Sequence, residues 1–308
     1  LYSLKLFKSD YITFLSGFKI NLDYIHISKE SIYLQGPLEE ISLYDIYLLA
    51  IINEVYYKLK YNYNDLLESA RHKLKIKIDK FNHADYRFKF VEFGTRRRLS
   101  REWQEEMVLN FSKYCSNYIG TSNVALALKL GSTPIGANGH EVIQLYEAIP
   151  GIPLEHINYY FMEDWLKEYP TNEIMVTDTL TTKLFLNDLT YDLANKLRGV
   201  RNDSGDPFNW GNQIIQKYKQ LNINPKDKTL LFSNGLSFTN AQLIYDYFKD
   251  KTNISFGIGT FCSNDTFASP LNIVFKLQYV DNIPVGKLTD DTSKAIYPVE
   301  FEQIKQYI

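Results

Sequence analysis

From Phe88 onward the chain repeats one scheme, in which a short apolar run ends in Gly, Ser, Thr or Asp and an amphipathic helical pattern follows. Parallel strands need a crossover connection, usually a helix, so this alternation predicts a parallel α/β sheet. About seven such units favour closure into an α/β barrel. The predicted strands lie in FKFVEF (88–93), YIGT (118–121), TPIGA (133–137), EIMVTDT (173–179), LRGVRNDSG (197–205), TLLFSNG (229–235) and ISFGIGT (254–260).

The flanking regions read differently. Residues 1–87 predict an N-terminal α/β domain with a helix over 10–18, two short strands within 23–28 and 31–36, and a long helical region from Ser42 to Phe81. Residues 88–268 then form the barrel with the active site. Residues 269–308 predict a hairpin turning near Asp281 and Asn282, and a helix, packed back on the N-terminal domain. Because the chain begins at Leu1 without a methionine, we expect its natural start to be missing.

Charge and cysteine content exclude several functions. Lys and Arg total 34 against 36 Asp and Glu, so the chain lacks the cationic field that duplex nucleic acid or an acidic membrane selects. The apolar stretch IYLLAIINEVYY (46–57) is too short to span a bilayer. Cys115 and Cys262 show neither metal-ligand spacing nor a disulfide framework. We therefore expect a cytoplasmic protein with neither nucleic acid nor membrane as partner.

A cluster of cationic side chains follows the strand predicted within 88–93, in EFGTRRR (92–98). Each guanidinium of Arg96, Arg97 and Arg98 can donate two parallel hydrogen bonds to a carboxylate or phosphate, and Thr95 adds a hydroxyl. The alternative is a solvated helix start, but the positive end of a helix disfavours added arginines. We expect Arg97 or Arg98 to face a ligand, and at least one of the three to pair with a protein carboxylate.

A mixed cluster of charges occurs in GVRNDSGDP (199–207). Side chains alternate along a strand, so Arg201 and Asp203 are predicted on one side, followed by Ser204 and Gly205. They are either a surface ion pair or a site for a polyanion that carries hydroxyls or Mg²⁺. Asp178, in VTDT, is either a second ligand carboxylate or the N-cap of the next helix.

Two glycine-containing strand ends form a candidate phosphate cradle. Glycines allow backbone N–H groups to approach an anion, although tight turns also favour them; the residues are Ser233, Gly235, Gly257, Gly259 and Thr260. His140, in PIGANGHEV (134–142), precedes a predicted helix. It is either a structural hydrogen-bonding residue or a nucleophile toward phosphoryl groups.

The stretches EFGTRRR, GTSNVALA, GVRNDSGDP, SFGIGT and PLNIV, in this order, resemble the nicotinate phosphoribosyltransferases, specifically their bacterial and yeast-like form. The resemblance implies a type II phosphoribosyltransferase fold, an irregular α/β barrel joined to a smaller α/β domain built from both ends of the chain. It also implies ATP-coupled transfer of phosphoribose from phosphoribosyl pyrophosphate to nicotinate, giving nicotinate mononucleotide and pyrophosphate in NAD salvage, with Mg²⁺ as cofactor. A homodimer with a shared active site is implied as well.

The resemblance also implies roles for individual residues. His140 would carry the phosphohistidine, Arg201 would lie near the pyridine ring or pyrophosphate, and Asp203 would meet the ribose hydroxyls and Mg²⁺, with Asp178 as a second acidic group. The 5′-phosphate would be held by Ser233, Gly235, Gly257 and Gly259. The nicotinate carboxylate or the pyrophosphate would be bound by Gly120, Thr121, Ser122, Arg97 and Arg98.

Three other functions remain open. A nicotinamide or a quinolinate phosphoribosyltransferase would share the fold, but the three arginines favour a substrate with a carboxylate over a neutral amide. The third alternative is a non-catalytic homologue that binds a phosphorylated metabolite, against which the presence of Arg201, Asp203 and His140 argues.

Overall fold

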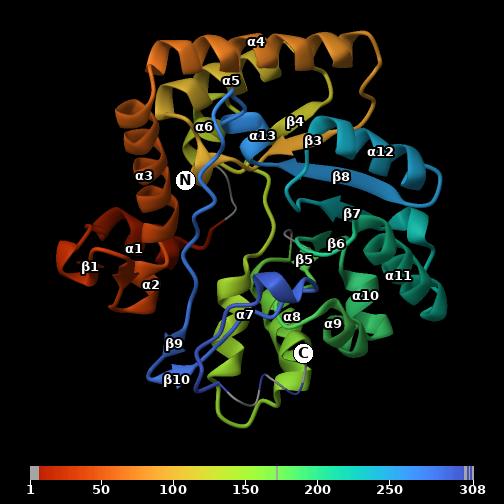
Figure 1. The fold of residues 1–308 in the computed structure, drawn as a ribbon. Helices are drawn as coiled ribbons and strands as arrows, with labels where there is room; N and C mark the ends of the chain where they lie inside the picture. The colour runs from red at the N-terminus through yellow and green to blue at the C-terminus, as the bar shows by residue number, and fades with distance from the viewer. Residues whose placement is uncertain (1–6, 171–172, 302–303, 305, 307–308) are drawn as a thin grey trace.

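A computed structural model describes residues 7–170, 173–301, 304 and 306. Its centre is a six-stranded sheet in the order β4-β3-β8-β7-β6-β5, in which all pairs are parallel (Figure 1). The strands are β3 (Phe90–Glu92), β4 (Tyr118–Thr121), β5 (Ile174–Val176), β6 (Gly199–Asn202), β7 (Thr229–Phe232) and β8 (Asn253–Ile258). The predicted α/β class is therefore confirmed.

Helices connect these strands and cover the sheet. In chain order they are α5 (Arg101–Tyr114), α6 (Val124–Lys129), α7 (His140–Glu147), α8 (Ile157–Glu168), α9 (Thr182–Asp188), α10 (Tyr191–Lys196), α11 (Pro207–Gln220), α12 (Phe238–Phe248) and the short α13 (Thr260–Ser263). Most begin at a side-chain cap of the expected type. Ser100, for example, accepts a hydrogen bond from Trp103 N at 3.0 Å, and Asp206 accepts one from Asn209 N at 2.7 Å, ahead of Pro207.

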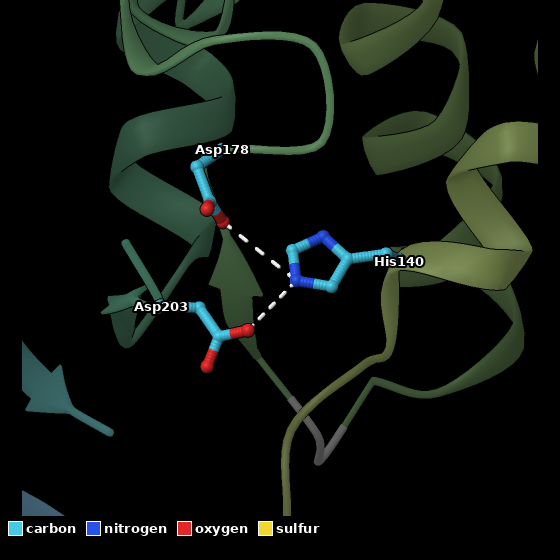
Figure 2. A group of neighbouring side chains, drawn as sticks. All are labelled: His140, Asp178 and Asp203. Atoms are coloured by element: carbon cyan, nitrogen blue, oxygen red, sulfur yellow. Dashed lines mark hydrogen bonds and ion pairs between the residues drawn. The ribbon is translucent and has the colours of Figure 1, made fainter. Parts of the chain in front are cut away.

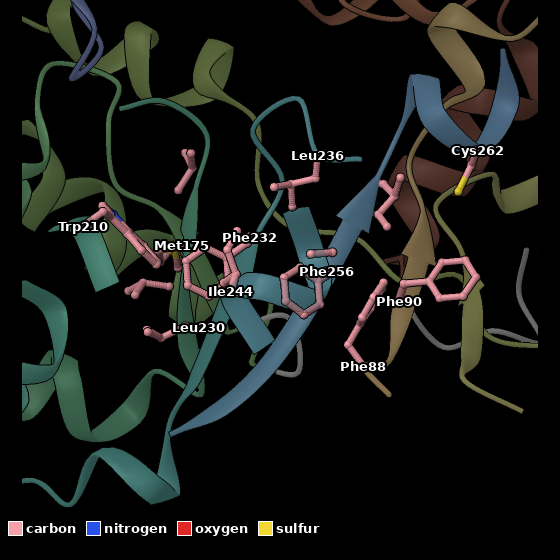
Figure 3. Close-up of a cluster of buried hydrophobic side chains, with 14 of the residues drawn as sticks. Phe88, Phe90, Met175, Trp210, Leu230, Phe232, Leu236, Ile244, Phe256 and Cys262 are labelled. Carbon is pink, nitrogen blue, oxygen red and sulfur yellow. The ribbon is translucent and has the colours of Figure 1, made fainter. Parts of the chain in front are cut away.

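The core lies between the sheet and these helices (Figure 3). Strands β3 and β5 are buried at every position, as expected for a parallel sheet covered on both faces. Aromatic rings fill much of the space: Phe232 and Phe256 from adjacent strands stack 5.8 Å apart, and Phe88 meets Phe256 edge-on at 4.9 Å. This packing fixes the carboxyl ends of the strands, where the candidate site lies.

The segment 133–138, predicted to contain a strand, has no strand geometry. Pro134 lacks a donor for a ladder and Gly136 favours irregular backbone. Even so, the segment joins the two edge strands: Ile135 N donates to Thr121 O of β4 at 3.0 Å, and Asn138 Oδ1 accepts from Val176 N of β5 at 2.9 Å. No ladder pairs β4 with β5 among the described residues, so this segment is what links the sheet's edges.

The N-terminal region contains α1 (Ser9–Gly17), the antiparallel pair β1 (Ile25–Ile27) and β2 (Ile32–Leu34), α2 (Leu38–Ile41), α3 (Tyr44–Lys60) and α4 (Tyr63–Asn82). The long helical region predicted from Ser42 to Phe81 is in fact two helices. Their break falls at Asn62, whose side chain caps α4 by accepting from Asn64 N at 3.1 Å. Helix α3 contacts the turn that carries the arginines, where Asn53 Nδ2 donates to Arg96 O at 3.1 Å.

The C-terminal region forms the predicted hairpin, with β9 (Tyr279–Val280) and β10 (Ile283–Pro284) around Asp281 and Asn282. Both turn residues have positive φ, 48° and 65°, as a tight hairpin turn requires. In Figure 1 the hairpin lies beside α7. Gln144 Nε2 of α7 donates a hydrogen bond of 3.1 Å to Leu277 O, two residues before the hairpin. The predicted C-terminal helix falls mainly on residues outside the described ranges. Within the described residues, no helix has the length and apolar character needed to cross a bilayer.

Candidate active site

One histidine and two aspartates converge at the carboxyl ends of β5 and β6 (Figure 2). His140 is the first residue of α7, whereas Asp178 and Asp203 follow the two strands. His140 Nε2 lies 2.9 Å from Asp203 Oδ2 and 3.8 Å from Asp178 Oδ1, and its Nδ1 lies 3.0 Å from Thr179 Oγ1. Three segments that are distant in the sequence thus place their functional groups around one imidazole.

Burial and charge act in opposite directions on this group. Burial lowers the pKa of His140, while Asp203 and Asp178 act to raise it. Burial acts to raise the pKa of Asp203, but Arg201, His140 and Lys287 outweigh it and hold that pKa well below its usual range. Asp203 is therefore an anion at neutral pH, next to an imidazole in which burial favours the neutral form.

Arg201 ties this cluster together from the strand side. As strand alternation predicts, it lies on the same side as Asp203, and its Nη2 donates to Asp203 Oδ1 at 2.8 Å. Its Nε donates to Ser233 Oγ at 2.8 Å and its Nη1 to Asn138 O at 3.2 Å. The pair is only slightly exposed, with 15% and 21% of the side chains accessible, so it is not a solvated surface pair.

Asp178 does not cap the following helix, which was one interpretation of the sequence. Thr181 is the N-cap of α9, and its Oγ1 accepts from Leu184 N at 3.2 Å. Asp178 is buried, and its Oδ2 accepts a hydrogen bond from Ser204 Oγ. Its Oδ1 is buried and has no hydrogen-bond partner among the described residues, so one acceptor beside His140 is unused there.

Two lysines of the C-terminal region reach this site, and the sequence reasoning missed both. Lys287 is buried with its Nζ 3.8 Å from Asp203 Oδ2. Burial and the nearby Lys287 lower the pKa of Lys276 to about 8. The available signal was a lysine inside each of two otherwise apolar runs, NIVFKL and IPVGKL, where burial of an amine requires an anion nearby.

A second polar network lies at the ends of β3 and β4, centred on Glu92, another residue that the sequence reasoning missed. Glu92 is fully buried; its Oε2 accepts from Thr121 Oγ1 at 2.6 Å and from Gln104 Nε2 at 3.1 Å. Gln104 Nε2 also donates to Thr95 Oγ1 at 2.9 Å, and Ser122 N donates to Glu92 O at 2.9 Å. Burial raises the pKa of Glu92, against the effect of these hydrogen bonds.

The three arginines of the turn have different partners. Arg96 Nη1 pairs with Asp45 Oδ2 of α3 at 2.9 Å, so the prediction that at least one pairs with a carboxylate is confirmed. Arg98 Nη1 donates to Gln104 Oε1 at 3.3 Å, while its Nε is buried and finds no partner within the residues that the structure describes. No described residue accepts a hydrogen bond from the half-buried Arg97 guanidinium. Burial, and then the charge of Arg96, lower the pKa of Arg97, whereas Asp203 acts to raise it.

The candidate phosphate cradle lies at the ends of β7 and β8. Gly235 has a φ of 57° and open space where a Cβ would stand, and Ser233 Oγ lies 3.1 Å from Asp203 Oδ1. Gly257 has a packing reason to be glycine, because a Cβ there would come 2.4 Å from the Phe93 ring. The backbone of Gly259 lies against Phe93 as well, and Thr260 begins α13. Their role toward a phosphate stays a prediction.

Most of the predicted residues therefore lie at the carboxyl ends of the strands. The Arg201 guanidinium lies 6.0 Å from the centre of the ring of Phe93, the residue just before the turn that carries the arginines. Gly120, with a φ of 148°, is the next-to-last residue of β4 and lies beside Ile135. Gly205, with a φ of 70°, permits the close approach of Asp290, whose Cβ lies 3.2 Å from where a glycine Cβ would stand. Cations and carboxylates at the carboxyl ends of parallel strands define an α/β enzyme that handles anionic, hydroxylated substrates.

Comparisons with known proteins give the family. Residues 88–306 match the model of the nicotinate phosphoribosyltransferase (NAPRTase) family. Nicotinate phosphoribosyltransferase of Herminiimonas arsenicoxydans is 37% identical over 96% of this chain and 77% of its own length, and that of Acinetobacter baumannii is 35% identical over 96% and 76%. The crystal structure of nicotinate phosphoribosyltransferase from Vibrio cholerae superposes with a TM-score of 0.88 at 31% identity, over 97% of this chain and 76% of that one.

A putative nicotinate phosphoribosyltransferase from Saccharomyces cerevisiae superposes with a TM-score of 0.85 at 28% identity, over 97% of this chain and 79% of that one. The chain belongs to the nicotinate phosphoribosyltransferase family, whose members are enzymes.

Proposed function

We propose that this chain transfers the phosphoribosyl group of phosphoribosyl pyrophosphate to nicotinate, giving nicotinate mononucleotide and pyrophosphate in NAD salvage. The observation that carries the proposal is the joint placement of Arg201, Asp203 and His140 at one sheet edge. The half-buried Arg97, without an acceptor among the described residues, lies within the electrostatic reach of Asp203. A carboxylated ring and a phosphorylated sugar together match this distribution of charge.

In the transfer, the bond from the anomeric carbon to pyrophosphate breaks as the bond to the pyridine nitrogen forms. Positive charge develops on the ribose, so the anionic Asp203 stabilises it and holds ribose hydroxyls. Arg201, Lys287 and Lys276 are the cations available to the departing pyrophosphate. Arg97 or Arg98 would orient nicotinate by its carboxylate, while the glycines of the cradle, with Ser233 and Thr260, would bind the 5′-phosphate.

Mg²⁺ fits the residues present. The buried Asp178 Oδ1 has no partner, and it lies in a group of His140, Asp178 and Asp203 whose ligand atoms are within 4.8 Å of one another. Magnesium prefers oxygen, so Asp178 and Asp203 would hold it, with His140 outside its coordination. When bound, it would neutralise charge on pyrophosphate. The protein's own part is to keep that one carboxylate oxygen free.

ATP hydrolysis is proposed to be coupled to this reaction through His140. A neutral imidazole nitrogen attacks the γ-phosphorus of ATP, the N–P bond forms as the bond to the β-phosphate oxygen breaks, and ADP leaves. Phosphorylation adds close to two negative charges beside Asp203, a change large enough to reorganise the surrounding cations. Hydrolysis of the phosphohistidine returns the free imidazole and releases inorganic phosphate.

Labelling tests the ATP step. Incubation with ATP labelled at the γ-phosphate should put acid-labile label on the wild type and none on His140→Ala. His72→Gln is the matched control, since His72 is exposed on α4. Absence of both labelled protein and nicotinate mononucleotide would favour a non-catalytic homologue that binds a phosphorylated metabolite.

Substrate choice is tested at the arginine turn. Arg97→Met should raise the KM for nicotinate by about tenfold or more, because a charge-assisted contact contributes about 1.5–3 kcal/mol. The same change at Arg96 should matter less, since that side chain is already paired with Asp45. Turnover of nicotinamide or quinolinate by the wild type at the nicotinate rate would instead favour one of those two activities.

Sedimentation of the wild type tests the proposed homodimer. Mixing two impaired variants, His140→Ala and Arg97→Met, at a low nicotinate concentration asks whether subunits share a site, because turnover above that of either variant alone requires residues from both chains.

A further inference from the structure

Residues 286–290 cross the candidate site, and we call this segment the strap. Its backbone is bound at three alternate residues. Gly286 N donates to Glu147 Oε2 at 2.7 Å, Leu288 N to Thr179 O at 2.9 Å, and Asp290 N to Ser204 Oγ at 2.9 Å. Lys287, between the first two of these contacts, faces Asp203. The strap therefore carries one cation to the site and ends on the hydroxyl that binds Asp178.

The carboxylate of Asp290 anchors the end of the strap. Both of its oxygens bind Thr182, the first residue of α9: Oδ1 accepts from the backbone N at 2.7 Å and Oδ2 from Oγ1 at 2.6 Å. The Thr182 hydroxyl also contacts Thr177, which in turn contacts Trp210. Trp210 Nε1 can only donate, and it donates to Thr177 Oγ1 at 2.9 Å; that hydroxyl lies 2.8 Å from Thr182 Oγ1. Thr182 Oγ1 has a single hydrogen, which it donates to the Asp290 carboxylate, so it accepts from Thr177 Oγ1.

The hydrogen bond from Asp290 N to Ser204 Oγ orients Asp178 through the Ser204 hydroxyl. Because Ser204 Oγ accepts from Asp290 N, its own hydrogen is available to Asp178 Oδ2. That hydrogen bond leaves Asp178 Oδ1 without a partner, buried and 3.8 Å from His140 Nε2. A loose strap would free the Ser204 hydroxyl to rotate, and with it the carboxylate of Asp178.

We propose that Asp290 is a positioning residue for the reaction: by anchoring the strap to Thr182, it holds Lys287 at Asp203 and keeps the free oxygen of Asp178 directed at His140. This inference rests on the proposed function, to which it adds a residue that does not itself contact substrate. Asp290 lies at an exposed position of the chain, although its carboxyl packs against the buried Thr182 and burial raises the pKa of that carboxyl.

The kinetic test compares Asp290→Ala with Asp291→Ala. Asp291 is the matched control, because its Oδ1 binds only Ser293 and its Oδ2 lies 3.6 Å from Lys294. We expect Asp290→Ala to lower kcat for nicotinate mononucleotide formation about 10–100-fold, the cost of lost positioning around reacting groups. The KM for nicotinate should change by less than about threefold, since the arginine turn is untouched, and the control should stay within about twofold of wild type.

A conservative variant and a double variant separate positioning from general damage. Asp290→Asn keeps an acceptor for Thr182 N and should retain more activity than Asp290→Ala. Since Asp290 acts through Ser204, the double variant with Ser204→Ala should lose little more than the worse single variant. Losses that multiply, or a kcat for Asp290→Ala equal to that of the control, would overturn the proposal.

A spectroscopic measurement tests the positioning role of Asp290 without an activity assay. The side-chain nitrogen resonances of His140, identified by their loss in His140→Gln, should move in Asp290→Ala and stay in place in Asp291→Ala. Unmoved resonances would refute the positioning role even if the enzyme is active. If the wild type makes no nicotinate mononucleotide but the His140 resonances still shift in Asp290→Ala, the positioning role stands and the proposed function fails. If Asp290→Ala does not fold, the same comparison is made with Asp290→Asn.

Discussion

Glu147 allows a sharp prediction about stability and pH. It closes α7, the helix that begins at His140, and its Oε2 accepts from Gly286 N of the strap at 2.7 Å. The residue is only 9% exposed, and its Oε1 is buried with no hydrogen-bond partner in the part of the chain that the structure describes. Burial raises the pKa of Glu147 to about 8, against the opposing effect of the Gly286 hydrogen bond. An ionised carboxylate in this position lowers the free energy of unfolding, whereas a neutral group would not.

The direction in which stability changes with pH follows from the number of protons that the folded and unfolded chains bind. Between the unfolded pKa of about 4.5 and the folded pKa of about 8, the folded chain holds a proton that the unfolded chain has released. The stabilising effect is therefore fully present below pH 4.5 and is lost as the pH rises through 8. Each pH unit between these values costs about 1.4 kcal/mol, so the whole effect reaches at most about 5 kcal/mol. Glu147→Gln is neutral at every pH and keeps an acceptor oxygen for Gly286 N.

Urea unfolding at pH 5, 7 and 9 measures this difference. We expect Glu147→Gln and wild type to be similar near pH 5, and the variant to be more stable by several kcal/mol at pH 9, with Glu30→Gln, at an exposed position, as the control. Parallel curves for wild type and Glu147→Gln across this range would refute the assigned pKa and its cause.

Three further outcomes follow from the structure. Gly199→Ala should destabilise the fold by about 3 kcal/mol or more, because the new Cβ would meet Thr229 O at 2.0 Å, whereas Gly17→Ala enters open space and should change stability by less than about 0.5 kcal/mol; equal melting temperatures would contradict this. Burial raises the thiol pKa of both Cys115 and Cys262, so a thiol reagent should modify neither in the folded protein and both in urea, and rapid labelling before unfolding would argue against the packing. Chelation with EDTA should abolish nicotinate mononucleotide formation and added Mg²⁺ should restore it; full turnover in EDTA would remove the metal from the proposal.

Much of the fold was predictable because its signals are local. The strands β3, β4, β5, β6 and β7 each fall within a predicted stretch, and β8 begins one residue before its stretch, since a buried parallel strand is a short apolar run that ends at a turn residue. The segment 133–137 was wrongly predicted as a strand because apolar residues alone do not reveal that Pro134 and Gly136 prevent a ladder. The break between α3 and α4 was missed because the apolar pattern runs through it.

The chemistry-bearing residues divide in the same way. Arg201 and Asp203 could be placed on one side of a strand because their spacing of two is a property of the strand itself. Strand ends meet at one edge of a parallel sheet, so the convergence of Asp178 and Asp203 also follows from local order. Contacts that span long stretches of chain carry no such signal: Lys287 beside Asp203, and Asp290 on Thr182, depend on where the C-terminal region returns.

By itself, the sequence determined the α/β class, the order of the strands along the chain and the set of polar groups at their ends, because backbone periodicity and turn chemistry act over a few residues. Only the tertiary structure decided which groups share a charge environment. It buried Glu92 and Glu147, left Arg97 without an acceptor among the described residues, and brought the strap over His140. The physical reason is that burial, and the pKa of a buried group, depend on every element packed around it, whatever its distance along the chain.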